Sequence, residues 1–190
     1  ETTVAVLDTG VNYNRSEFGT CPGENCKVVY TQDFAPEDNT LDDNGHGTNV
    51  AAIVIGVAPD TQIAALDVFD GSTAWNSDIN LAIDWTINNK ELYNIVAINL
   101  SLGSGEYTKP CDITFPPRLK DPLYDSINSA RNAGIMTVAA SGNDGFTAAI
   151  ASPACVPNAI SVGAVYDYSG TYSGSCTDSA SSDRVACFSN

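Results

Sequence analysis

Short apolar runs alternate along the chain with segments in which apolar residues recur at helical spacing. Six runs of four to seven residues are predicted to be strands: 3–8, 27–30, 62–68, 95–100, 135–140 and 159–165. Most of these runs lack the polar alternation of a half-exposed strand. Such a pattern is typical of strands that are buried on both faces of a parallel sheet.

Three of the intervening segments are predicted to be helices. The first covers about residues 48–56, and the second covers about 77–90 with Ser77 as its N-cap. The third is predicted to begin with Asp121 as N-cap and Pro122 at the first helical position. Strands and helices in this alternating order indicate an α/β fold, a doubly wound and mostly parallel sheet with helices on both faces. In such a fold, sites lie outside the carboxyl ends of the strands.

Length, composition and charge narrow the class of protein. The 190 residues predict a single domain over residues 1–190, and a hydrophobic content of 43% excludes a disordered chain. The net charge of −15 would repel phosphate backbones and anionic lipid, so we expect no nucleic-acid or membrane partner. The longest apolar run, residues 51–59, is far shorter than the roughly 20 residues of a membrane-spanning helix.

Six cysteines in this acidic chain indicate an oxidising compartment and therefore a secreted protein. Six cysteines allow fifteen pairings, and a zinc cluster is disfavoured because the chain has one histidine and no C-x₂-C pair. Two cysteine pairs flank short polar loops, and local pairing there leaves the third pair as a long-range link. The favoured disulfides are Cys21–Cys26, Cys176–Cys187 and Cys111–Cys155.

An aspartate and the one histidine stand where the predicted sheet would bring them to the same edge. Asp8 ends the first strand, and His46 opens a helical segment 38 positions later. A carboxylate that accepts a hydrogen bond from one imidazole nitrogen leaves the other nitrogen free to act as a general base. Taken alone, the same residues are better explained by a turn-capping Asp and a solvent-exposed His.

Nine segments in a fixed order carry a resemblance to a known family. They are VAVLDTG, GHGTNVAAI, GVAP, SDINLAIDW, INLSLG, VAASGNDG, SPA, ISVGAV and FSN. In sequence and spacing they resemble the subtilisin-like serine proteases, from Thr3 to Asn190. The resemblance implies a secreted endopeptidase that cleaves peptide bonds with an Asp-His-Ser triad and a peptide or protein as its substrate.

The resemblance also implies a role for individual residues. Asp8 would be the triad carboxylate, His46 the general base, and Asn143 the side-chain donor of the oxyanion hole. Asn143 also fits an ordinary turn at residues 142–145. Two further segments resemble the strand that pairs with the substrate backbone and the wall of the specificity pocket, although both also fit ordinary strand ends. Their residues are Leu100, Ser101, Leu102 and Gly103 for the strand, and Ala140, Ser141 and Gly142 for the wall.

The family's nucleophile has no counterpart in the chain. No serine stands in a G-T-S-M-A-type motif, and Ser101, Ser141 and Ser152 do not match the family nucleophile. We therefore expect the chain to be inactive alone, with the C-terminal part of the domain on another chain or lost. Apolar surface exposed by its absence would bind that missing part or a second copy. The alternative function is a non-catalytic pseudoprotease that binds peptides.

No cofactor is required by this chemistry, but one acidic loop offers ligands for calcium. Glu37, Asp38, Asp42 and Asp43 lie within seven positions, and oxygen ligands suit a hard cation. A solvated acidic loop explains the same residues. Another alternative is that Asp43 orients the turn before His46.

Overall fold

The computed structural model describes residues 1–36, 39–112 and 120–190. The chain divides into two compact units, and each is described by itself. The first contains Glu1–Ser101 and Asp125–Thr137, and the second contains Leu102–Tyr124 and Val138–Asn190. The expectation of a single domain stays a prediction.

Four neighbouring strands of a parallel sheet lie in the first unit, in the order β6-β1-β3-β2. Asp8 pairs in register with Asp67, and Asp67 pairs with Asp33, so three strands end in aspartate at the same edge. The strands are β1 (Thr3–Asp8), β2 (Val28–Asp33), β3 (Gln62–Asp67) and β6 (Ile95–Leu100).

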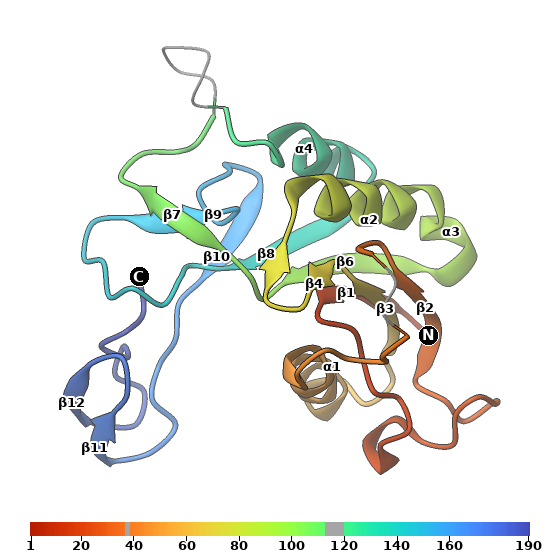
Figure 1. Ribbon diagram of the computed structural model, residues 1–190, viewed down its shortest axis with the longest axis horizontal. Coiled ribbons are helices and arrows are strands. Elements are labelled where there is room, and N and C mark those ends of the chain that lie inside the picture. The colour runs from red at the N-terminus through yellow and green to blue at the C-terminus, as the bar shows by residue number, and fades with distance from the viewer. Residues whose placement is uncertain (37–38, 113–119) are drawn as a thin grey trace. The chain divides into compact units, whose positions relative to one another are not determined.

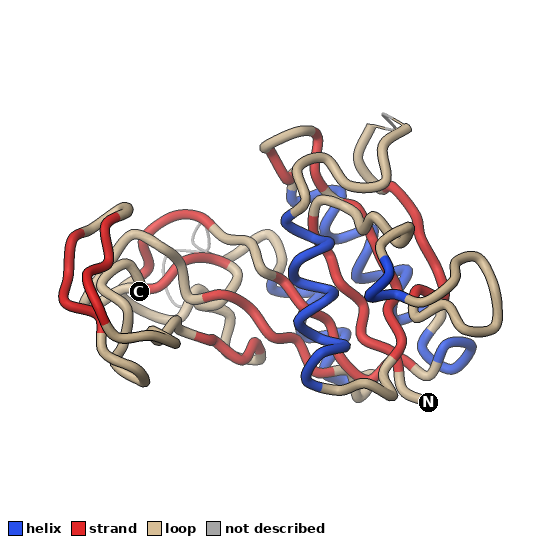
Figure 2. Tube along the Cα trace, turned by 90° about the horizontal axis from the view of Figure 1, so that it is seen from below, coloured by secondary structure: helices blue, strands red, loops and turns tan. Residues whose placement is uncertain are grey.

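Helices flank these strands on both sides, as predicted. In Figure 1, α1 lies on one side of β1 and β3, and α2 lies on the other. Figure 2, seen from below, shows α1 in blue in front of the strands. The helices are α1 (His46–Val57), α2 (Asn76–Asn88), α3 (Lys90–Tyr93) and α4 (Tyr124–Asn132), with a 3₁₀ turn, η1 (Ser16–Phe18). The α/β fold class with a mostly parallel sheet is therefore confirmed.

The apolar core of the first unit lies between α1 and the sheet. α1 buries Gly47, Ala51 and Ile55, which recur every four residues and so form one stripe of the helix. Ala51 and Ile55 of this stripe pack in a cluster of buried residues, which contains Val6, Val11, Phe18, Val28, Ala51, Ile55, Ile63 and Ala65. Burial of this cluster fixes α1 on the sheet and places the first residue of α1 beside the end of β1.

The starts of two helices differ from the prediction. α2 begins at Asn76, so Trp75, which has no side-chain acceptor, is at the N-cap position, and Ser77 lies within the helix with its hydroxyl bonded to Asp78. α4 begins two residues later than predicted: the Leu123 N–H donates to Asp121 Oδ1 at 2.8 Å within a turn that precedes the helix. Among the described residues, no helix has both the length and the apolar character needed to cross a membrane.

The second unit is built from short strands and tight loops. In it, the last three residues of β8 neighbour β10, and the strands β7 and β9 pair antiparallel. A hairpin, β11–β12, follows in the region where the sequence becomes rich in Ser, Gly and Asp. The bounds are β7 (Ser104–Tyr107), β8 (Met136–Ala140), β9 (Ile150–Ser152), β10 (Ala159–Val162), β11 (Gly170–Ser173) and β12 (Thr177–Ala180).

The first unit contains one further pair of strands. They are β4 (Phe69–Asp70) and β5 (Thr73–Ala74), which form a short antiparallel hairpin.

All six cysteines are paired, in the three combinations favoured from the sequence. Cys21–Cys26 closes a loop in the first unit, and the other two disulfides lie in the second. Cys111–Cys155 links residues 44 positions apart, and Cys176–Cys187 ties the β11–β12 hairpin to the segment after it.

Candidate active site

Asp8 and His46 are in direct contact. Asp8 ends β1 with its side chain 1% exposed, and His46 begins α1 with its side chain 51% exposed. The His46 Nδ1–H donates to Asp8 Oδ1 at 2.6 Å, and the Thr9 N–H donates to the same oxygen at 2.8 Å. This bond fixes the imidazole tautomer and leaves Nε2 able to accept a proton.

Burial raises the pKa of the Asp8 carboxyl above its ordinary value. The hydrogen bond from His46, the bond from the Thr9 backbone and the charge of His46 all oppose that increase. The second oxygen, Oδ2, is buried and has no hydrogen-bond partner within the described residues. The charged form of Asp8 therefore depends on the bonds that reach Oδ1.

Glycines on either side of His46 let α1 approach the end of β1. Gly45 caps the helix with a left-handed backbone, φ +90°, which side chains rarely adopt. A Cβ at Gly47 would lie 2.1 Å from the carbonyl oxygen of Gly10 and 3.1 Å from the Asp8 Cβ. The two glycines of the GHGT segment are therefore needed for the helix to pack closely against the end of the strand.

The side chain of Asp42 organises the turn before His46. Asp42 Oδ1 accepts from the Gly45 N–H at 2.8 Å and from the Thr9 hydroxyl at 2.8 Å. Asp42 Oδ2 accepts from the Thr48 N–H at 2.8 Å and from the Thr48 hydroxyl. Sequence reasoning did not assign this role to Asp42, and its alternative that Asp43 orients the turn stays a prediction.

The hydrogen bonds to Asp42 also control its ionisation. Burial acts to raise the pKa of Asp42, but the bonds from Thr48, Thr9 and Gly45 outweigh it. The pKa of Asp42 therefore lies below its ordinary value, and the carboxylate is charged at neutral pH.

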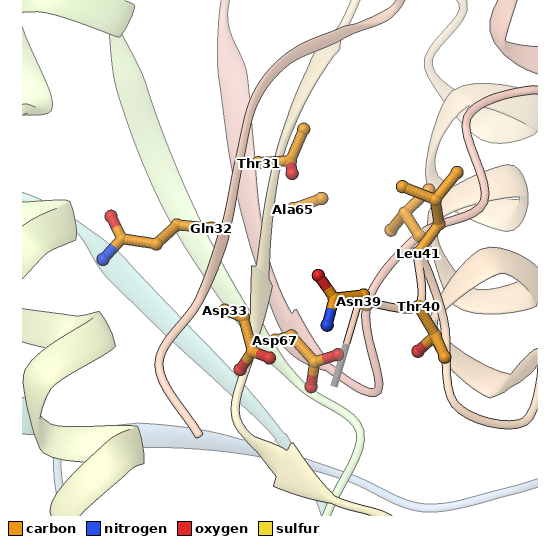
Figure 3. Close-up of a pocket in the computed structure, with 10 residues that line it drawn as sticks. Thr31, Gln32, Asp33, Asn39, Thr40, Leu41, Ala65 and Asp67 are labelled. Atoms are coloured by element: carbon orange, nitrogen blue, oxygen red, sulfur yellow. The ribbon is translucent and has the colours of Figure 1, made fainter. Parts of the chain in front are cut away.

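A polar cavity of about 430 Å³ lies beside Gly10 in the first unit (Figure 3). Asp33 and Asp67 lie side by side at the ends of β2 and β3 with their carboxylates pointing the same way, and the Asn39 side chain points toward Asp67. Backbone N–H groups already bond one oxygen of each acid: Ala35 donates to Asp33 Oδ1, and Phe69 donates to Asp67 Oδ1.

The calcium loop expected from the sequence is only partly described. Glu37 and Asp38 lie outside the described residues. Both oxygens of Asp42 accept hydrogen bonds, and Asp43 Oδ1 accepts from the Thr40 hydroxyl at 3.2 Å. The carboxylates of Asp42 and Asp43 thus have hydrogen-bond donors within the protein.

The residues expected to pair with substrate follow β6. Leu100 is buried as the last residue of β6, and the Ser101 hydroxyl donates to Asn99 Oδ1 at 3.0 Å. Leu102 is half-buried and Gly103 is exposed. A Cβ at Gly103 would lie 2.8 Å from the carbonyl oxygen of Ser152, so packing against β9 already requires a glycine there.

In the second unit, Asn143 lies exposed in the turn that follows β8 and Ser141. Ala140 ends β8, Ser141 is 3% exposed, and Gly142 has a left-handed φ of +115°. These residues, expected to wall the specificity pocket, form one continuous segment with Asn143.

Asn190 holds this turn from 46 residues away in the sequence. Its Oδ1 accepts from the backbone N–H of Asp144 at 2.9 Å and of Phe146 at 3.0 Å, and its own N–H donates to the Gly142 carbonyl oxygen. A Cβ at Gly142 would lie 2.1 Å from Asn190 Nδ2. Sequence reasoning missed this role, although the FSN segment that ends in Asn190 was among the nine segments of the resemblance.

Comparison with curated proteins shows close relatives. A model of the subtilase family matches residues 1–190. "Subtilisin-like protease 2" of Trichophyton rubrum is 36% identical over 168 residues, which is 84% of this chain and 35% of that protein. The protein of the same name from Trichophyton verrucosum is 35% identical over 168 residues, with the same coverage. The chain thus spans about a third of the length of these relatives.

Solved structures agree with the relatives. A structure titled "S41 Psychrophilic Protease" is 28% identical with a TM-score of 0.69, and the match covers 99% of this chain and 58% of that one. A cold-adapted subtilisin-like serine proteinase is 29% identical with a TM-score of 0.68, over 100% of this chain and 59% of that one. From the family match over its whole length and from these relatives, the chain belongs to the subtilase family of proteases.

Proposed function

We propose that these residues are part of a secreted serine endopeptidase domain that hydrolyses peptide bonds. The observation that carries the proposal is the 2.6 Å hydrogen bond from His46 Nδ1 to the buried carboxylate of Asp8. In a subtilase, this pair activates a serine. None of the serines in these 190 residues stands in the family's nucleophile motif, so we place the nucleophile outside them.

The proposed chemistry passes through an acyl-enzyme. As the serine oxygen attacks the carbonyl carbon of the peptide, His46 Nε2 takes the serine proton and then gives it to the leaving amine. Water activated by the same nitrogen releases the acyl group. Asp8 keeps the proton on Nδ1 and stabilises the imidazolium that forms in each step, while remaining ionised itself.

Asn143 is the proposed side-chain donor to the oxyanion. An amide N–H stabilises the developing negative charge without losing a proton. Its exposure, and the turn that Asn190 holds in place, support the assignment. The proposed substrate is a peptide or protein that binds along residues 100–103 and against residues 140–142 chiefly through its backbone.

Because they lack the nucleophile, we expect these residues by themselves to have no protease activity. A peptide-binding pseudoprotease is the second candidate, since it would account for a chain with no assigned serine. The intact contact between Asp8 and His46 favours the protease, because a peptide-binding protein has no use for a buried carboxylate bonded to a histidine.

Exposed apolar side chains suggest what else binds the chain. In the second unit, Ile160 is 42% and Val162 is 49% exposed on β10, and in the first unit Ile53 and Val57 of α1 are exposed. We propose that further residues of the same domain cover them, with self-association as the alternative. No cofactor is part of the proposed mechanism, and calcium at the acidic loop stays a proposal.

The proposed location is extracellular. Three disulfides are typical of proteins that fold in an oxidising compartment, and nothing in the proposed chemistry needs free thiols.

Labelling with a fluorophosphonate tests the proposed function. The reagent modifies only a serine that is activated by a base. We expect labelling of the longer protein that contains these residues, loss of labelling in its His46→Ala variant, and none in the 190-residue chain. A longer protein that folds, binds peptides and takes up no label would contradict the protease and support the pseudoprotease.

A further inference from the structure

We propose that Asp42 is a positioning residue, which holds His46 in the orientation that bonds Asp8. The inference rests on the proposed function of the Asp8–His46 pair and extends it to a residue that does not touch either of them. It follows from the hydrogen bonds that converge on the Asp42 carboxylate.

Asp42 joins three separate pieces of the first unit. Its Oδ1 binds the strand end through the Thr9 hydroxyl and the turn through the N–H groups of Asn44, at 3.2 Å, and Gly45, at 2.8 Å. Its Oδ2 binds the first turn of α1 through the N–H and hydroxyl of Thr48. One carboxylate therefore sets the distance and the angle between the end of β1 and the start of α1.

Thr9 connects this carboxylate to the catalytic pair. Its hydroxyl donates to Asp42 and accepts from the Gly47 N–H at 3.0 Å, while its own N–H donates to Asp8 Oδ1. The residues on both sides of His46, Gly45 and Gly47, are thus bonded to Asp42 directly or through Thr9. The backbone of His46 has little freedom to move away from Asp8.

The helix itself favours a charged residue at this position. The first N–H groups of an α-helix lack partners within the helix and carry partial positive charge. Asp42 accepts from two backbone N–H groups at the start of the 12-residue α1, those of Gly45 and Thr48. This arrangement also allows a plain capping role, in which Asp42 would stabilise α1 without affecting the contact of His46 with Asp8.

The variant Asp42→Asn separates the two roles. Asparagine has the same shape, but its NH₂ group would face the donors of Thr48 or Thr9, so one side of the network must open. His46 is the one histidine in the sequence, so its ring resonances are unambiguous in a ¹⁵N-histidine-labelled NMR spectrum of the chain. Positioning predicts that the downfield Nδ1–H resonance weakens and that the ring becomes a mixture of tautomers, while circular dichroism is retained.

In the complete protease, the same variant should lower kcat about a hundredfold, the effect of a displacement of about 1 Å in a catalytic group, with KM changed less than about twofold. The matched control is Glu17→Gln, which removes a charge from an exposed side chain lining the same 390 Å³ cavity as Asp42. We expect neither the His46 spectrum nor kcat to change in this control.

Two other outcomes would overturn the proposal. If the His46 spectrum of folded Asp42→Asn is unchanged, Asp42 serves only to cap the helix. If Glu17→Gln has an equal effect, the loss of negative charge alone, and not the hydrogen bonds of Asp42, explains the change. If Asp42→Asn does not fold, Thr48→Val removes one donor to Oδ2 and must weaken the same resonance in folded protein. The NMR result does not depend on turnover, so it distinguishes failure of this inference from failure of the proposed protease.

Discussion

The backbones of Gly10 and Gly47 lie so close that a Cβ at Gly47 would stand 2.1 Å from the Gly10 carbonyl oxygen. This contact brings the first turn of α1 against the residues that follow β1. The distance between Asp8 and His46 therefore depends on a position that bears no chemistry of its own.

Gly47→Ala should force α1 away from β1. A Cβ in this contact requires a backbone shift, and overpacking of this kind costs about 1–3 kcal/mol. We expect the free energy of unfolding in urea to fall by that amount and the His46–Asp8 bond to lengthen. Gly56→Ala is the matched control in the same helix, because a Cβ there meets nothing within 4 Å and alanine favours the helix by about 0.5–1 kcal/mol. Equal destabilisation by both variants would refute the close-contact explanation.

Asp8→Asn should leave the fold largely intact and nearly abolish turnover of the complete protease. An asparagine cannot keep the proton of His46 on Nδ1, and the corresponding change in a well-studied Ser-His-Asp protease costs about 10⁴ in kcat. The measurement is steady-state hydrolysis of a peptide substrate, with KM expected to change little. A loss below about tenfold would show that the Asp8–His46 bond is not part of the catalytic machinery.

The lowered pKa of Asp42 predicts a pH-dependent contribution to stability. A carboxyl with a lower pKa in the folded state stabilises that state above its ordinary pKa of 3.8, and this stabilisation is lost as the pH falls through the lower folded value. At neutral pH, Asp42→Asn should cost about 1–2 kcal/mol, the size of a lost helix cap. The difference in unfolding free energy between wild type and variant should stay constant above pH 5 and shrink below pH 4.

The contribution of Asp8 to stability changes with pH in the opposite direction to that of Asp42. Because burial raises its pKa, ionisation of Asp8 opposes folding, and stability from this group decreases as the pH rises from 3.8 to the raised folded value. Asp8→Asn lacks this loss, so its stability relative to wild type should increase as the pH rises through that range. A difference that is flat with pH would contradict the raised pKa.

Asn190→Ala should loosen the turn that carries Asn143. Two backbone N–H groups, of Asp144 and Phe146, would lose their acceptor, so we expect faster hydrogen exchange at both. In the complete protease kcat should fall, by at most the 10²–10³-fold that loss of an oxyanion donor costs. Asn190→Asp is the control for hydrogen exchange, since it keeps an acceptor oxygen and replaces an Nδ2 that has no hydrogen-bond partner in the described residues; it also adds a negative charge, so its kcat is not compared. Equally fast exchange in both variants would argue against the role of Oδ1.

The sequence predicted six of the strands, β1, β2, β3, β6, β8 and β10, and the contact between Asp8 and His46, for identifiable reasons. The unbroken apolar runs of β1 and β3 identify parallel strands because both faces of these strands are buried, and an Asp at the end of such a run must lie at the carboxyl edge. β10 is an exception, since its apolar run is largely exposed. The nine segments of the subtilase resemblance then singled out His46 as its partner.

The remaining features depend on side-chain geometry that no periodicity encodes. Asp42 and Asp43 are adjacent and chemically identical, and only the path of the turn decides which carboxylate faces Thr9 and Thr48. Ser77 does not cap α2 because the helix already begins at Asn76, which no local pattern indicates. Asn190 binds a turn 46 residues away, and a contact of that range leaves no local pattern.

The long separation between Asn190 and its turn has a consequence for biosynthesis. A nascent chain is made from its N-terminus, so residues 8 and 46 are both available long before residue 190 exists. Asp8 and His46 can therefore meet early, whereas the segment around Asn143 must wait for Asn190 to emerge. Until then, the backbone N–H groups of Asp144 and Phe146 lack the acceptor that holds their turn in the folded chain.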